Sequence, residues 1–239
     1  MRLLVAPLAL LCLLASFDLA AAAQLPGGYY YLDARKLDLV DLLPPPPDPN
    51  SPAAMADETK VAKVVAQRTP AQMAQARDES KRSVFFFAPS VGPNFTAAAL
   101  PKTALFFKHA ESDVEKLVDV AKEYWQRPRP PFAPEKHGSY PSGHAAFAAS
   151  SAIMLSLMLP EKRGAIFTQA REFAENRIIL GVHYPTDVAA GWTAGTLAVS
   201  VMQHNDRYKT DFLAAELELR KAMGLSVNGG GQAFQPALP

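Results

Sequence analysis

Two histidines lie in short polar segments that can support group-transfer chemistry. His144 ends the segment Tyr140-Pro-Ser-Gly-His, and His183 lies between Arg177 and Asp187. Histidine is the side chain that most readily exchanges a proton near neutral pH, and it can also attack an electrophile. A pair of histidines can therefore divide the work, with one ring attacking and the other supplying a proton.

The residues around the two histidines predict a site for a dianion. Positive charge is available from Lys122, Arg129 and Arg177, and neutral donors from Ser142 and Gly143. Backbone N–H groups at the start of a helix bind phosphate oxygens, and an apolar run follows Gly143. Each segment alone also has an ordinary explanation, as a basic helix end or a capping residue. Together they predict phosphoryl transfer by positioning and charge stabilisation, without a metal or another cofactor.

Three ordered motifs carry a resemblance to a known superfamily. They are Lys-x6-Arg-Pro from Lys122, Pro-Ser-Gly-His ending at His144, and Arg-x5-His-x3-Asp from Arg177. This pattern resembles the signature of the type-2 phosphatidic acid phosphatase and vanadium haloperoxidase superfamily. The Pro-rich stretch after Leu43 and the Gly-Ser-Tyr before the second motif are similar to the soluble bacterial class A nonspecific acid phosphatases. The chain departs from the family at Asn176, where serine usually precedes the motif arginine.

The resemblance implies an acid phosphatase that hydrolyses small phosphate monoesters through a phosphohistidine intermediate, without a metal. It implies that His183 is the nucleophile, that Asp187 orients its ring, and that His144 protonates the leaving alcohol. The phosphate-binding residues that it implies are Lys122, Arg129, Ser142, Gly143 and Arg177. It also suggests a homo-oligomer, with a dimer as the expected form.

Three alternatives use the same residues. A vanadate-dependent haloperoxidase is the first, because a pocket that binds phosphate can hold vanadate, although the chain is short for one. A lipid phosphatase acting at a membrane surface is the second. A helical protein that binds phosphate without turnover is the third, and the intact pair of His144 and His183 argues against it.

The start of the chain predicts export to the periplasm or the medium. Arg2 precedes an apolar run from Leu3 to Phe17, and the alanines at 21–23 offer a signal-peptide cleavage site before Gln24. A retained membrane anchor is the alternative. The single cysteine, Cys12, lies within this leader, so the mature protein must be stable without disulfide bonds.

Charge and hydropathy argue against two classes of partner. A formal net charge of +1 gives no whole-chain attraction to nucleic acid or to an anionic membrane. The apolar stretches 145–159 and 188–202 are too short or too rich in small residues for membrane spans, and we expect buried helices there. No nucleic-acid partner and no stable membrane insertion are therefore expected.

The elements that must position these residues are predicted to be helices. Good helix formers and helical apolar spacing predict helices over residues 53–67, 70–87, 113–125, 142–159, 161–180, 187–204 and 206–223. Prolines interrupt the chain between residues 88 and 101 and between 127 and 140, where loops are expected. Since no alternation typical of strands occurs, the sequence predicts an all-α fold with a single helical bundle.

The domain layout follows from these elements. We expect a signal peptide over residues 1–23, an N-terminal arm with the Pro-rich stretch over 24–52, a helical phosphatase domain over 53–225, and a flexible tail over 226–239. The histidines outside the motifs are expected to lie on the surface or in loops; they are His109, His137 and His204.

Overall fold

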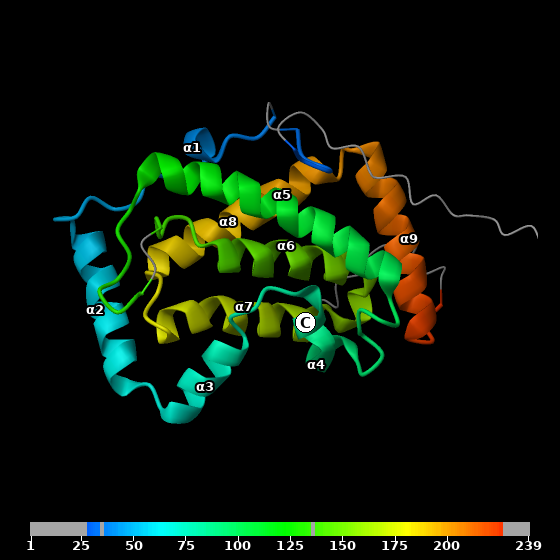
Figure 1. The fold of residues 1–239 in the computed structure, drawn as a ribbon, viewed down its shortest axis with the longest axis horizontal. Helices are drawn as coiled ribbons and strands as arrows, with labels where there is room; N and C mark the ends of the chain where they lie inside the picture. The colour runs from blue at the N-terminus through cyan, green and yellow to red at the C-terminus, as the bar shows by residue number, and fades with distance from the viewer. Residues whose placement is uncertain (1–27, 34–35, 135–136, 227–239) are drawn as a thin grey trace, which may run out of the picture.

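The computed structural model describes residues 28–33, 36–134 and 137–226, and all regular structure in these ranges is helical (Figure 1). The α-helices are α1 (Leu39–Leu42), α2 (Pro52–Gln67), α3 (Pro70–Asp78), α4 (Ala88–Val91), α5 (Pro101–Trp125), α6 (Gly143–Met158), α7 (Arg163–Ile179), α8 (Pro185–Met202) and α9 (Asp206–Ala222). Two 3-10 helices are η1 (Val84–Phe87) and η2 (Pro160–Lys162). The expected all-α fold is confirmed. The predicted signal peptide, and the predicted tail beyond Ser226, lie outside the described residues.

Helix α6 is the centre of the bundle and packs against α5, α7 and α8 (Figure 1). Its small side chains are buried all round, as expected of a helix that is apolar on every face: Ala145, Ala146, Ala148, Ala149 and Ala152. Helix α8 can approach α6 closely because Gly191 and Gly195 have no Cβ. A Cβ at either position would collide with the backbone at Ser142 or Ala146. This close contact ties the starts of α6 and α8 together.

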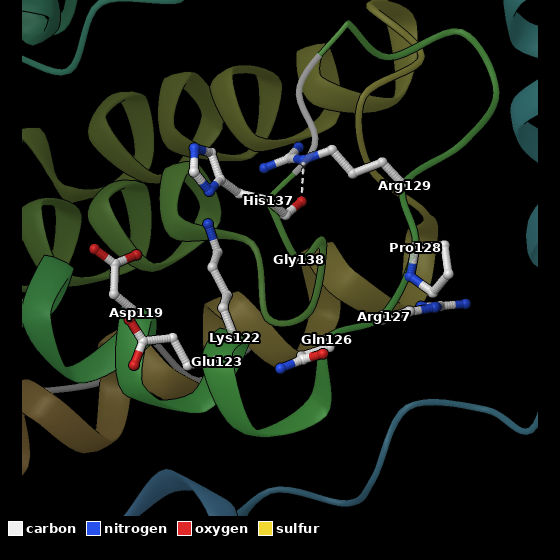
Figure 2. Close-up of a pocket in the computed structure, with 9 residues that line it drawn as sticks. All are labelled: Asp119, Lys122, Glu123, Gln126, Arg127, Pro128, Arg129, His137 and Gly138. Atoms are coloured by element: carbon white, nitrogen blue, oxygen red, sulfur yellow. Dashed lines mark hydrogen bonds between the residues drawn. The ribbon is translucent and has the colours of Figure 1, made fainter.

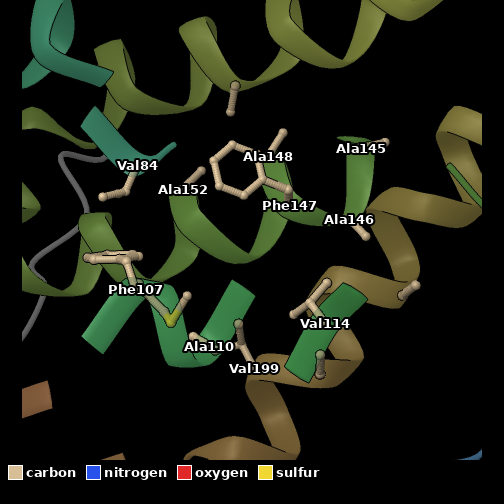
Figure 3. Packing of buried hydrophobic residues seen from close by; sticks show 14 of the residues in the cluster. Val84, Phe107, Ala110, Val114, Ala145, Ala146, Phe147, Ala148, Ala152 and Val199 are labelled. Atoms are coloured by element: carbon tan, nitrogen blue, oxygen red, sulfur yellow. The ribbon is translucent and has the colours of Figure 1, made fainter. Parts of the chain in front are cut away.

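Larger side chains surround the small residues of α6 (Figure 3). Phe107 and Val114 reach the core from α5, Val199 from α8 and Val84 from η1, and all four are buried. Full burial of a side chain of this kind stabilises the fold by roughly 1.5–3 kcal/mol. The packed core therefore holds the helix ends in fixed relative positions.

Four helix ends meet at one end of the bundle, on the left in Figure 1. Helices α5 and α7 run toward this end and bring Lys122 and Arg177 in their last turns. Helices α6 and α8 begin there, with their N-terminal turns formed by the second and third motifs. Helix N-termini carry partial positive charge, which favours anions at this end.

Two predicted helix boundaries are wrong. The helix expected over residues 70–87 ends at Asp78, because Ser83 starts a new 3-10 turn whose Val84 and Phe87 side chains are buried. The helix expected from Asp113 begins at Pro101. Its apolar face continues backward through buried side chains that the sequence analysis left unassigned: Phe106, Phe107 and Ala110.

The expectation for His109 is also wrong, because its ring is buried within α5. It stacks on Tyr30 with ring centroids 3.9 Å apart. The Asp113 carboxylate, one turn further along α5, accepts hydrogen bonds from the backbone N–H groups of Tyr30, Tyr31 and Leu32, at 2.8, 2.6 and 2.9 Å. The N-terminal segment is thus fastened to α5. His137 and His204 are exposed, as expected.

Candidate active site

His183 lies in the short connection between α7 and α8, and a tight turn fixes its place. Gly181 adopts φ of 74°, a conformation that glycine tolerates. The N–H of Gly181 donates to the carbonyl of Ile178 at 2.9 Å, and that of Val182 donates to Arg177 at 3.1 Å. This helix end places Arg177 in the last turn of α7 and His183 directly beyond the turn.

The buried ring of His183 has a defined tautomer. Its Nε2 lies 3.2 Å from Arg129 Nη1, and its Nδ1 lies 3.3 Å from Asp187 Oδ2. Because a guanidinium can only donate, Nε2 accepts and Nδ1–H donates to Asp187. Burial lowers the pKa of His183 to about 4, although the hydrogen bond to Asp187 acts in the opposite direction. The ring is therefore neutral near pH 7, with its lone pair on the Nε2 atom that faces Arg129.

Asp187 is fully buried and held by several donors. Its Oδ2 accepts from the Tyr184 N–H at 2.9 Å, and its Oδ1 accepts from Arg127 Nη1 at 2.6 Å. Burial favours the neutral acid, but the hydrogen bond to His183 and the charge of Arg127 outweigh it and lower the pKa of Asp187. Its backbone carbonyl also accepts from the Ser142 N–H at 2.9 Å, which joins the second and third motifs.

The start of α6 forms a cradle for an anion. The Ser142 hydroxyl accepts from the Ala145 N–H at 3.4 Å, so its own hydrogen is available to a ligand. A Cβ on Gly143 would lie 3.3 Å from Arg82 Nη1 and 3.8 Å from Lys122 Nζ. Burial, and then the charge of Arg129, lower the pKa of Lys122. The predicted donors Ser142, Gly143 and Lys122 thus gather at one helix N-terminus.

His144 follows this cradle in the first turn of α6. Its Nε2 lies 2.8 Å from the carbonyl oxygen of Ser80, and since a carbonyl only accepts, Nε2 carries the hydrogen. The ring packs near Phe173, with centroids 5.8 Å apart. Burial, and then the charge of Arg177, lower the pKa of His144 to about 2. With this pKa the ring is neutral near pH 7.

The structure adds residues that sequence reasoning did not assign. Arg82 comes from the loop after α3; its Nε lies 3.5 Å from Glu111, and its Nη2 pairs with Glu115. Arg127 joins Asp187 to Asp57, whose carboxylate it contacts at 2.8 Å. Arg127 lies inside the first motif and so had a positional signal. Arg82 had none, because only the folded path of the loop brings it to α6.

An open cavity of about 730 Å³ lies on the Lys122 side of the site (Figure 2). The side chains of Lys122 and Arg129 extend into it, and the Arg129 Nε donates to the carbonyl of His137 at 3.0 Å. Asp119 and Glu123 lie beside Lys122 on α5 and line the same cavity. Its lining therefore combines both signs of charge.

Neither a metal-binding cluster nor a membrane-spanning helix is found among the described residues. In these ranges, no three side chains from His, Cys, Asp and Glu gather closely enough to hold a metal ion. None of the described helices has both the length and the apolar character needed to cross a bilayer. Metal independence itself stays a prediction.

The chain is similar to known proteins along most of its length. Residues 112–211, which contain every predicted site residue, match the PAP2 superfamily. The non-specific acid phosphatase of Providencia stuartii is 28% identical over 215 residues, covering 82% of this chain and 86% of the relative. The non-specific acid phosphatase of Salmonella typhimurium (strain LT2) is 31% identical over 179 residues, covering 67% and 72%.

A solved structure shares the arrangement of helices. It is the crystal structure of the first transmembrane PAP2 type phosphatidylglycerolphosphate phosphatase from Bacillus subtilis, with a TM-score of 0.50 and 25% identity. The match covers 65% of this chain and 87% of that one. The similarity thus extends from the motifs to the helices that carry them.

Proposed function

This chain belongs to the PAP2 superfamily and its acid phosphatases, and from that premise we propose that it hydrolyses small phosphate monoesters through a phosphohistidine at His183. One observation carries the proposal. The buried His183 ring has Nδ1–H directed at Asp187 and an unprotonated Nε2 directed at Arg129, within a group of cations. A neutral ring with an unprotonated Nε2 can attack phosphorus once a phosphoryl oxygen takes the Arg129 hydrogen bond from that atom.

The first step forms the bond between His183 Nε2 and phosphorus while the bond to the leaving oxygen breaks. Asp187 stabilises the imidazolium character that develops on the attacking ring. His144 donates a proton to the leaving oxygen, and the alcohol departs. The cations and the donors at the start of α6 hold the phosphoryl oxygens as charge redistributes.

The second step hydrolyses the phosphohistidine. His144, now without the donated proton, accepts one from a water molecule as the oxygen of that water attacks phosphorus. The bond between phosphorus and His183 breaks, and inorganic phosphate is released. His183 returns to its neutral form and His144 again carries a proton.

The acid role of His144 requires a protonated ring, whereas burial and the charge of Arg177 lower its pKa to about 2. A dianionic phosphoryl group nearby favours the protonated ring. Substrate binding is therefore coupled to proton uptake at His144. We expect kcat to fall as pH rises, and an NMR titration of His144 to show a higher pKa with inorganic phosphate bound than without it.

Replacing His144 with alanine separates its acid role from simple binding. The variant should lose about 10³-fold in kcat/KM for an alkyl phosphate, because alkoxide needs the proton. For p-nitrophenyl phosphate the loss should be at least about tenfold smaller, because p-nitrophenolate leaves without one. His204→Ala, at an exposed histidine in the turn after α8, should change neither rate. Equal losses on both substrates would rule out the acid role.

The proposed function is tested with the wild-type protein and p-nitrophenyl phosphate in excess EDTA at mildly acid pH. Steady turnover, together with a phosphoryl group retained on histidine after rapid quenching in alkali, would support a phosphohistidine mechanism without a metal. Absence of turnover would overturn the proposal. Peroxide-driven halide oxidation after vanadate loading, or release of phosphate from lipid phosphates, would then identify the alternative activity.

Two parts of the proposal concern the whole protein. We place the mature protein in the periplasm or the medium, because residues 1–23 have the pattern of a signal peptide. A homodimer is the assembly that the family resemblance suggests. Both stay predictions, which N-terminal sequencing and light scattering of the secreted protein would test.

A further inference from the structure

A second cavity, of about 440 Å³, has a different lining from the one in Figure 2. Three guanidinium groups line it, from Arg68, Arg77 and Arg177, and no carboxylate is among its described lining residues. Phe132 and Val182 add apolar surface. The cavity beside Lys122, by contrast, includes Asp119 and Glu123.

In the proposed mechanism the leaving alcohol lies beside His144, which supplies its proton. The nucleophile and the leaving oxygen lie on opposite sides of phosphorus in an in-line transfer. The Nε2–H of His144 points at the carbonyl of Ser80, and Ser80 lines the second cavity. Since Ser80 contacts the acid His144 and lines the second cavity together with Arg177, this cavity adjoins the place where the leaving alcohol takes its proton.

The arginines of this cavity can receive an anion. Arg68 is anchored by a hydrogen bond of 2.6 Å from its Nη1 to the carbonyl of Ile179, which leaves the other N–H groups of its fork for a ligand. Arg77 is exposed in the last turn of α3. A planar guanidinium matches carboxylate and phosphate oxygens in geometry and charge.

From this placement we infer that the second cavity binds the alcohol part of the substrate and selects an apolar or aromatic alcohol that carries a second anionic group. The inference rests on the proposed phosphatase activity and adds a substrate class to it. Arg177 serves the transferred phosphoryl group, whereas Arg68 and Arg77 hold the second anion. The apolar side chains of Phe132 and Val182 contact the carbon frame between the two anions.

The test compares 4-(carboxymethyl)phenyl phosphate with its neutral analogue, 4-(carbamoylmethyl)phenyl phosphate. The methylene group insulates the ring from the substituent, so the two phenols leave with similar ease. We expect kcat/KM to be about tenfold higher for the carboxylate, because a charge-assisted hydrogen bond to arginine forms only there. Added salt should reduce this preference, since Arg77 is exposed.

Variants assign the preference to the cavity. Arg77→Gln should bring the ratio of the two kcat/KM values to within about twofold of one. The matched control Arg171→Gln, at an exposed arginine of α7, should retain the wild-type preference for the carboxylate. No preference in the wild type, or a preference that persists in both Arg77→Gln and Arg68→Gln, would overturn the inference while phenyl phosphate is still hydrolysed. If phenyl phosphate itself is not hydrolysed, the proposed function falls and this inference with it.

Discussion

Alanine in place of His183 is expected to reduce kcat for p-nitrophenyl phosphate by at least about 10⁴-fold, because no other side chain can form the covalent intermediate. The ring is buried between Asp187 and Arg129, so its removal leaves no histidine nitrogen at this point of the site. Rapid-quench measurements should show no phosphorylated protein. His204→Ala is the matched control and should retain full activity.

A stability measurement separates this chemical loss from misfolding. The pKa of His183 is about 4 in the folded protein and 6.5 for the ordinary side chain, so between these values the unfolded chain binds more protons. The neutral His183 ring therefore makes its full contribution to the free energy of unfolding above pH 6.5. This contribution is lost as pH falls toward 4. At about pH 5 the loss amounts to about 2 kcal/mol. His183→Ala should abolish that pH-dependent loss, which urea unfolding at two pH values would detect.

Replacing Arg127 with methionine is expected to lower the free energy of unfolding by about 3–5 kcal/mol near neutral pH. Methionine keeps an apolar stem but leaves two buried carboxylates, Asp57 and Asp187, without the guanidinium that contacts both. Loss of this contact also removes a constraint on Asp187, so kcat should fall more than KM rises. Urea unfolding and steady-state kinetics of the same variant measure both effects.

The double variant Asp57→Asn with Arg127→Met provides the control for charge. Removing one of the two carboxylates should recover part of the lost stability, because fewer buried charges remain unpaired. Arg171→Met, at an exposed site, should change stability by no more than about 0.5 kcal/mol. A cost below about 1 kcal/mol for Arg127→Met near pH 7 would contradict the structural role given to this arginine.

The sequence predicted the helices best where local signals and packing agree. Helix α6 begins at Gly143, one residue after the expected start, and α7 ends at Ile179, one residue before the expected end. The segment after Asp78 is rich in helix-forming residues, yet burial of the aromatic η1 segment overrides that preference. Tertiary packing, which a single sequence does not display, decided that boundary.

The candidate site was also predictable only in part. Contacts within or between the motifs were predictable, since His183 and Asp187 are close in the chain and the motifs share one end of the bundle. Ser80 and Arg82 reach the site from a loop with no motif, and Asp57 reaches Arg127 from α2. Such long-range polar contacts depend on how helices pack rather than on residue spacing.

The pairing of Arg82 with Glu111 and Glu115 has a consequence for product release. Arg82 Nη1 lies beside Gly143 at the start of α6, whereas Nε and Nη2 contact Glu111 and Glu115, so these two carboxylates compete with a phosphate in the cradle for the charge of Arg82. Burial raises the pKa of Glu111 to about 7, with Arg82 acting in the opposite direction and Glu115 adding to the rise. Acidification protonates Glu111 and weakens its competition for Arg82, so inorganic phosphate should inhibit the enzyme more strongly in acid than at neutral pH. Because the protonated carboxyl competes less for Arg82, product release should limit turnover more in acid than at neutral pH.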